Sequence, residues 1–174
     1  KQLKLIDGVS NFVPNIHGMI GSDKKIKELT EILNKDSNIV IIKAIELLRQ
    51  EKPFEGAIGL LTAYYDKTSD FSVRKSIAGF MNDLKDQTAC DEVITEIRKN
   101  WKPDTISMLV SSCWQSGLNY SAYSTDLARI FLTGDYVTAI ECLTVIEESI
   151  HELSKDGKSE IIKLLEEGTP SANH

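Results

Sequence analysis

The chain has few histidines, and no two of them stand at the spacing that a metal site needs. Its only histidines are His17, His151 and His174, which lie far apart in the sequence. A zinc site on a helix typically takes two histidines at positions i and i+4 of one face. Adjacent carboxylates such as Glu147 and Glu148 point about 100° apart on a helix, so they do not converge as an acid–base pair. We therefore expect no metal site, no cofactor and no catalytic residue, and we do not expect an enzyme.

The sequence is also poor in cysteine and in long apolar runs. Cys90, Cys113 and Cys142 are an odd number of thiols without CxxC spacing, which is neither a disulfide framework nor a zinc-binding pattern. They favour a reducing compartment, and no segment resembles a signal peptide or a membrane span. We expect a cytoplasmic protein without a membrane partner. The chain begins at Lys1 and not at Met, so a removed leader or upstream domain stays open as an alternative.

An excess of basic residues is missing as well. The chain contains 20 Lys and Arg against 26 Asp and Glu, which gives a net charge of -6 and a pI of about 5.1. Proteins that bind nucleic acid need clustered Lys and Arg, because these residues displace the counterions of the phosphate backbone. We therefore expect no nucleic-acid partner.

What the sequence does contain is a long region with helical periodicity. Residues 1–21 are interrupted by glycine, proline and asparagine, which predicts an irregular N-terminal arm. Across residues 22–168 apolar residues recur at helical spacing, and no segment alternates with period two for long. Residues 169–174 form a polar tail. The pattern predicts an all-α protein with eight or nine helices and no sheet, in which Gly134 ends one helix in the left-handed conformation.

Aspartates recur at regular intervals within the helical region. Four of them stand 34, 34 and 31 residues apart, each where the second helix of a predicted pair begins: Asp36, Asp70, Asp104 and Asp135. Helical-repeat families have periods in this range, since one helix pair cannot bury its apolar face without a neighbour. The sequence predicts stacked pairs with a closing helix, at 22–50, 53–86, 88–116, 121–149 and 157–168. An irregular helical bundle is the alternative.

Residues 70–78, with the sequence DFSVRKSIA, resemble the opening of the second helix in HEAT repeats. The resemblance implies a right-handed stack of antiparallel helix pairs, which is a short α-solenoid of the HEAT or armadillo type. In that family the aspartate and the arginine link neighbouring repeats, which would make Asp70 and Arg74 structural. The other three aspartates are not followed by this arginine. Solenoids bind partners on the surface of their second helices, so the resemblance implies a non-catalytic protein-interaction or scaffold module.

The second helices predict where a protein or peptide partner binds. Their apolar stripes are expected to face the core, as with Ala139, Leu143, Ile146 and Ile150 after Asp135. The residues on the opposite sides should form one contiguous surface, with a tryptophan as its aromatic anchor. The predicted partner-binding residues are Lys75, Asn82, Ser111, Trp114, Gln115, Thr138, Glu141 and Glu148.

The segment around this tryptophan has no charged residue. It extends from Asp104 to Asp126 and contains Trp114, Tyr120 and Tyr123. One interpretation is a pair of helices covered on both sides within the core. The other is a partner-binding patch, since aromatic residues without charge suit the centre of an interface. The sequence leaves both open.

Two further functions stay open as alternatives. The first is a HEAT-like enzyme of the DNA glycosylase type, which would need a basic groove. The sequence offers few residues for such a groove, namely Lys24, Lys25, Lys27 and Lys75. The second alternative is the helical regulatory part of a larger protein.

Overall fold

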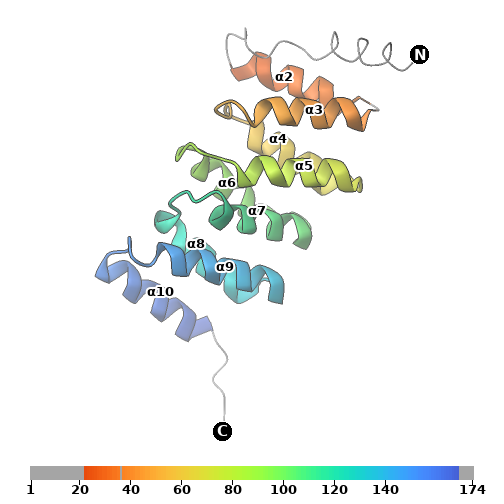
Figure 1. Cartoon of the computed structure of the whole chain (residues 1–174). Helices are drawn as coiled ribbons and strands as arrows, with labels where there is room; N and C mark the ends of the chain where they lie inside the picture. Colours follow the sequence, from red (N-terminus) through yellow and green to blue (C-terminus); the bar gives the residue numbers. More distant parts are fainter. Residues whose placement is uncertain (1–21, 36, 169–174) are drawn as a thin grey trace, which may run out of the picture. The chain divides into compact units, whose positions relative to one another are not determined.

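The part of the chain that the structure describes consists of helices and their connections. The computed structural model describes residues 22–35 and 37–168, so the predicted arm, the predicted tail and Asp36 lie outside it. Within these ranges there are nine α-helices, one 3-10 helix and no β-strand, which confirms the all-α prediction (Figure 1). None of these helices has both the length and the apolar character needed to cross a bilayer. The helices are α2 (Ser22–Leu33), α3 (Asn38–Leu48), α4 (Ala57–Lys67), α5 (Phe71–Asn82), α6 (Ala89–Ile97), α7 (Pro103–Gln115), η2 (Ser121–Tyr123), α8 (Ser124–Thr133), α9 (Tyr136–Ser149) and α10 (Lys155–Gly168).

The contacts between residues divide the helices into two units. Unit 1 ends at Leu84 and contains α2 to α5, and unit 2 begins at Lys85 and contains α6 to α10. The sequence predicted one repeat domain over residues 22–168, so the division falls inside that predicted domain.

In unit 1, α3 packs beside α5 and α2 packs beside α4. An apolar stripe at helical spacing, on α5 and just after it, is buried: Val73, Ile77, Phe80, Met81 and Leu84. Removing a side chain of this size from water contributes about 1.5–3 kcal/mol to folding. Apolar burial of this kind, and not the polar contacts, supplies most of the stability of the unit.

Polar contacts connect α3 to α5 at both ends. One oxygen of Asp70 accepts a hydrogen bond from the Val73 N–H at 2.8 Å and so caps α5. Its other oxygen accepts from Asn38 Nδ2, also at 2.8 Å, at the start of α3. At the far ends of the two helices, Arg49 Nε donates to Asp83 Oδ2 at 2.9 Å. Since starts contact starts and ends contact ends, α3 and α5 run side by side in the same direction.

Arg74 contacts a different helix. Its guanidinium carbon lies 4.2 Å from the centroid of the Tyr65 ring on α4. A cation over an aromatic face contributes about 0.5–1 kcal/mol at an exposed site. Asp70 therefore links α5 to α3, whereas Arg74 contacts α4.

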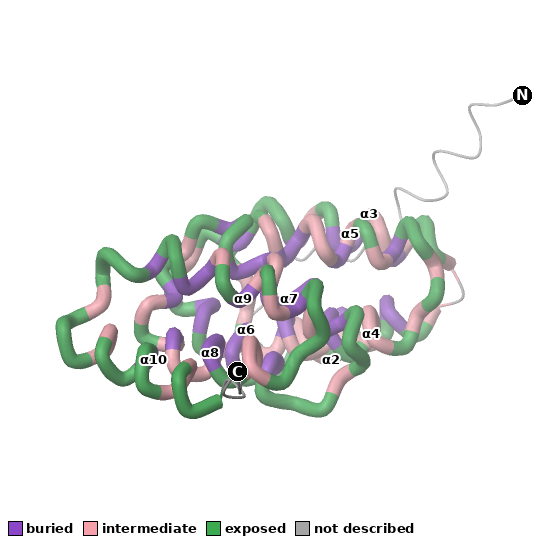
Figure 2. The backbone as a smooth tube through the Cα atoms, turned by 90° about the horizontal axis from the view of Figure 1, so that it is seen from below, coloured by how far each residue is buried: buried purple, intermediate pink, exposed green. Residues whose placement is uncertain are grey.

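In unit 2, α7 packs beside α9, and α8 packs against both α9 and α10. Figure 2 shows α7 and α9 in one layer of this unit, with α6, α8 and α10 in the other. The core between the layers includes Leu109, Tyr120, Leu127 and Val145.

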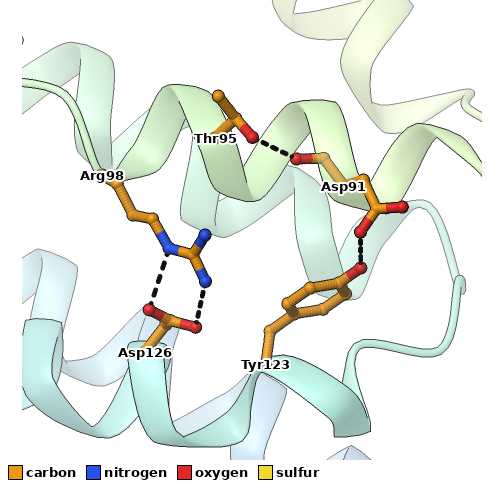
Figure 3. A network of polar contacts seen from close by, with 5 residues as sticks. All are labelled: Asp91, Thr95, Arg98, Tyr123 and Asp126. Carbon is orange, nitrogen blue, oxygen red and sulfur yellow. Dashed lines mark hydrogen bonds and ion pairs between the residues drawn. The ribbon is translucent and has the colours of Figure 1, made fainter.

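A network of polar side chains connects α6 to the start of α8 (Figure 3). Arg98 donates to both carboxylate oxygens of Asp126, from Nε at 3.0 Å and from Nη2 at 2.7 Å. The Tyr123 hydroxyl donates to the Asp91 carboxylate, and the Thr95 hydroxyl donates to the Asp91 backbone carbonyl at 2.7 Å. The hydrogen bond to Asp91 raises the pKa of Tyr123 to about 12. The paired guanidinium and carboxylate fix the orientation of two helices in the same layer.

The backbone at Gly134 differs from the prediction. Gly134 follows α8 with φ of -75°, in an extended and not a left-handed conformation, so the prediction is wrong. Glycine is needed there for space, because a Cβ would lie 2.9 Å from the Ile130 carbonyl oxygen. Among the described residues, the left-handed glycines are Gly56 (φ 89°) and Gly117 (φ 67°).

Candidate partner-binding surface

Helix α9 begins at Tyr136 because the preceding residue caps it. The Asp135 carboxylate accepts a hydrogen bond from the Thr138 backbone N–H at 2.8 Å. This hydrogen bond lowers the pKa of the Asp135 carboxyl. The cap thus fixes the start of the helix that carries the candidate surface.

The buried side of α9 is not the side that the sequence predicted. Leu143 and Ile150 were expected in the core, and each is 40% exposed. The prediction is wrong because α9 has apolar residues around most of its circumference, so the sequence fits more than one apolar stripe. A stripe shifted by one residue along the helix points about 100° away from the first. Contact with α7 and α8 decides which side is buried. That side consists of Thr138, Cys142, Val145, Ile146 and Ser149.

The exposed side of α9 carries large apolar side chains, which we call the α9 apolar face: Tyr136, Val137, Ile140, Leu143 and Ile150. Tyr136 is 80% exposed and Ile140 is 46% exposed. Four of the five recur at i, i+4, i+7 and i+14, which places them along one side of the helix. Isolated apolar side chains are normal on protein surfaces, but a group of neighbouring ones, such as Tyr136, Ile140 and Leu143, is a candidate for an interaction site.

The C-terminal half of α9 and the turn after it are acidic. Glu147 and Glu148 are exposed on the last turns of the helix, and Glu152 is exposed in the following turn. No described Lys or Arg forms an ion pair with these three carboxylates. The sequence contains no Lys or Arg between Arg129 and Lys155. One end of the candidate surface is therefore apolar and the other is negatively charged.

The acidic balance of the chain comes from the second half of the sequence. Residues 1–84 contain 12 Lys and Arg against 11 Asp and Glu, a net charge of +1. Residues 85–174 contain 8 against 15, a net charge of -7, and the two values add to the -6 of the chain. The potential around unit 2 therefore favours cationic partners.

A cleft of about 200 Å³ lies between the C-terminal ends of α7 and α9. On the α7 side, Gly117 in its left-handed conformation turns the chain away from the helix. Apolar and aromatic groups line the cleft together with two carboxylates, among them Trp114, Leu118, Val145, Glu148 and Glu152.

The structure brings together three of the predicted partner-binding residues. Trp114 is 36% exposed, and its Nε1 donates a hydrogen bond to Glu141 on α9. Trp114 and Glu148 both line the cleft. Ser111 and Gln115 lie one turn apart on α7, where Gln115 Nε2 donates to Ser111 Oγ at 2.7 Å. These five residues all belong to unit 2.

The other three predicted residues lie elsewhere. Thr138 is 2% exposed on the buried side of α9, so its prediction as a surface residue is wrong for the same reason as that of Leu143. Lys75 and Asn82 lie on α5, in unit 1, with Lys75 exposed and Asn82 half-buried.

The segment without charged residues contains both core and surface. Tyr120 is fully buried, whereas Trp114 is partly exposed. The core interpretation is therefore correct for Tyr120, whereas a partner-binding role of the exposed part stays a prediction.

The cysteines of unit 2 are buried thiols. Cys90, Cys113 and Cys142 are all free and buried. Burial raises the pKa of each of them, and that of Cys142 to about 12. Burial likewise raises the pKa of Tyr120, which neighbours Cys90 and Cys113. Nucleophilic cysteines need a lowered pKa and access to solvent, so these thiols are not activated.

No metal site stands out in residues 22–35 and 37–168, where no three His, Cys, Asp or Glu side chains are grouped to hold an ion. Comparison with protein-family models, with curated proteins and with solved structures finds no match to this chain. The function is therefore argued from the surface itself.

Proposed function

We propose that the chain is a non-catalytic protein-interaction module, built as a short HEAT-like stack of antiparallel helix pairs, that binds a protein or peptide on its second helices. The observation that carries this proposal is the α9 apolar face. Water covers this face in the unbound protein, and a partner that covers it would gain about 25 cal/mol for each Å² of apolar surface buried. The first five residues of α9, Tyr136–Ile140, carry no charge, which suits the centre of an interface.

The spacing of the polar contacts supports the repeat architecture. In both units, residues that form polar contacts between neighbouring helices or their connections lie about one predicted repeat apart in the sequence. The separations are 32 for Asn38–Asp70, 34 for Arg49–Asp83, 32 for Asp91–Tyr123, 32 for Gln87–Asn119 and 27 for Trp114–Glu141. A stack of similar helix pairs produces such a series, whereas an irregular bundle has no reason to repeat it.

The test is the affinity of the partner recovered from the native host, once it is identified, for variants of the full chain. Ile140→Ser with Leu143→Ser removes two members of the α9 apolar face. Anchors at the centre of an interface typically contribute 2 kcal/mol or more, so we expect binding to weaken at least about thirtyfold in calorimetric titration. Trp114→Ala is expected to weaken binding as well.

The matched control is Ile162→Ser on α10, which removes an apolar side chain that is 56% exposed on a different helix. It should leave the affinity unchanged. Circular dichroism must show that every variant keeps its helical content. A folded Ile140→Ser, Leu143→Ser variant that binds the partner as tightly as the wild type would refute the proposal.

The enzymatic alternative has a separate test. A DNA glycosylase binds the negatively charged phosphate backbone, and the net charge of -7 on residues 85–174 disfavours such binding. We expect no measurable affinity for duplex DNA at about 0.15 M salt. A submicromolar dissociation constant under these conditions would replace the proposal with the enzymatic one.

A further inference from the structure

We infer that the partner of the α9 apolar face is a basic amphipathic segment, with an apolar cluster at one end and Arg or Lys at the other. This inference rests on the proposed function and names the chemistry of the partner. Its basis is that α9 begins with the uncharged residues Tyr136–Ile140 and carries the exposed carboxylates of Glu147 and Glu148 on its last turns.

The distance between the apolar and the acidic residues of α9 sets the spacing of the matching groups on the partner. Ile140 and Glu148 are eight positions apart, which is about 12 Å along a helix. A partner that covers both must place its apolar and cationic groups about 12 Å apart. A helical partner spans this distance in about eight residues and an extended one in about four.

The cationic end of the partner fits the cleft beside Trp114. The cleft beside Trp114 holds about 200 Å³, which is below the 300–1,000 Å³ of typical small-molecule sites and suits a single side chain. Leu118 and Val145 offer apolar contact to an aliphatic stem, and Glu148 and Glu152 offer carboxylates to its charged head. The planar guanidinium of Arg also stacks on an indole ring, so Arg fits this cleft better than Lys.

The charge of α9 argues against a second copy of this chain on the same face. Two copies packed with their α9 helices parallel would bring Glu147 and Glu148 of each close together. An antiparallel pair would instead bury these carboxylates against the apolar start of the other α9, and in neither case does α9 carry a Lys or Arg to compensate. Like charges at an interface disfavour association, whereas a basic segment neutralises them. The unpaired carboxylates therefore select a cationic partner.

The experiment measures binding of three fluorescent peptides to the full chain by anisotropy. Each peptide has about 14 residues, to match the length of α9, and carries the same leucine cluster at one end. The other end carries three Arg, three Gln or three Glu. We expect the Arg peptide to bind about tenfold to a hundredfold more tightly than the Gln peptide, and the Glu peptide not to bind. Raising the salt concentration should weaken the binding of the Arg peptide and leave the binding of the Gln peptide unchanged.

Two pairs of substitutions localise the binding. Glu148→Gln with Glu152→Gln should reduce the preference for Arg over Gln to below about threefold, while the Gln peptide keeps its affinity. The control, Glu160→Gln with Glu166→Gln, removes the same charge from exposed positions on α10 and should change nothing. Ile140→Ser with Leu143→Ser should weaken the binding of the Arg peptide and of the Gln peptide by the same factor.

The outcomes separate this inference from the proposed function. Equal binding of the Arg and Gln peptides, lost in the Ile140→Ser, Leu143→Ser variant, overturns the inference and leaves the proposed function standing. A dimer in analytical ultracentrifugation that this variant abolishes also overturns the inference, since a second copy is then the occupant. If no peptide binds and the variant keeps its native partner, both fail.

Discussion

The two units of this chain expose apolar side chains in different ways. Among the described residues of unit 1 the exposed large apolar ones are Ile39 and Phe71, each at the start of a helix. In unit 2 most of them belong to the α9 apolar face, and the others are Trp114 on α7 and Ile162 on α10. Unit 1 is also nearly neutral, whereas residues 85–174 carry a net charge of -7. Among the described residues, the exposed apolar side chains therefore gather mainly on α9.

The polar contacts between α3 and α5 also differ from those between α7 and α9. In unit 1, Asn38–Asp70 and Arg49–Asp83 connect the two ends of α3 and α5. In unit 2, the link between α7 and α9 is the hydrogen bond from Trp114 to Glu141, which lies inside the candidate surface. A partner that binds at Trp114 therefore contacts the same groups that hold α7 to α9.

The largest effect is expected from a core truncation on α7. Its size is the reference against which a truncation on α9 shows which side of α9 is buried. Leu109→Ala, on the buried side of α7, should lower the free energy of unfolding by about 2–5 kcal/mol. Leu143→Ala, on the α9 apolar face, should lower it by less than about 1 kcal/mol. Urea unfolding followed by circular dichroism measures both. A loss at Leu143 as large as that at Leu109 would return this residue to the core.

The next effect concerns alkaline pH, because every cysteine of the chain lies in unit 2. In the unfolded chain a thiol titrates near pH 9, whereas burial raises the pKa of Cys142 to about 12 in the folded protein. Its contribution to stability is therefore complete below pH 9 and is lost as the pH rises from 9 to 12. Each shielded thiol should reduce the stability by about 1.4 kcal/mol for every pH unit in this window.

Urea midpoints at pH 8, 9 and 10 in the presence of a reductant measure this loss. Cys142→Ala removes one thiol and should make the stability fall less steeply above pH 9. An identical slope in the wild type and in this variant would show that Cys142 does not contribute.

A smaller effect is expected from the link at the starts of α3 and α5. Asp70→Ala removes both the cap of α5 and the acceptor for Asn38, and it should lower the free energy of unfolding by about 1–2 kcal/mol. Asn38→Ala should cost less, since the cap remains. In a double-mutant cycle we expect a coupling of about 0.5–1 kcal/mol between the two positions. Strict additivity would mean that the Asn38 hydrogen bond adds no stability.

The smallest effect is expected at the other end of the same helices. Arg49 and Asp83 have 37% and 46% of their side chains exposed, so solvent screens their attraction. Exposed ion pairs contribute about 0–1 kcal/mol. Arg49→Gln should therefore shift the urea midpoint less than Asp70→Ala does. A larger shift would show that Arg49 matters more for packing than for charge.

The sequence predicts the fold class because most helices of this chain have one apolar side. On α5 a single stripe from Val73 to Leu84 fits helical spacing, and the structure buries all of it. The capping positions of Asp70 and Asp135 follow in the same way, since both precede an apolar stripe and both cap a helix. Local chemistry alone determines these features.

The candidate site is less accessible to sequence reasoning because α9 has two apolar sides. Periodicity allows either the stripe with Leu143 or the stripe with Cys142, and only the packing of α7 and α8 selects between them. The near absence of polar residues from Tyr136 to Ile140 is the signal that could have identified a second, exposed side. Trp114 is predicted from the sequence because it is an aromatic residue in a segment without charges, and its role in binding stays a prediction.

The missing Lys and Arg between Arg129 and Lys155 also determine how α9 reacts with enzymes and reagents. Trypsin has no cleavage site within α9, so digestion releases the whole helix in one peptide, residues 130–155. Acylating enzymes and amine-reactive dyes have no ε-amino group to modify on it. Labels attached to the lysines of this chain therefore leave the α9 apolar face and the Trp114 cleft chemically untouched.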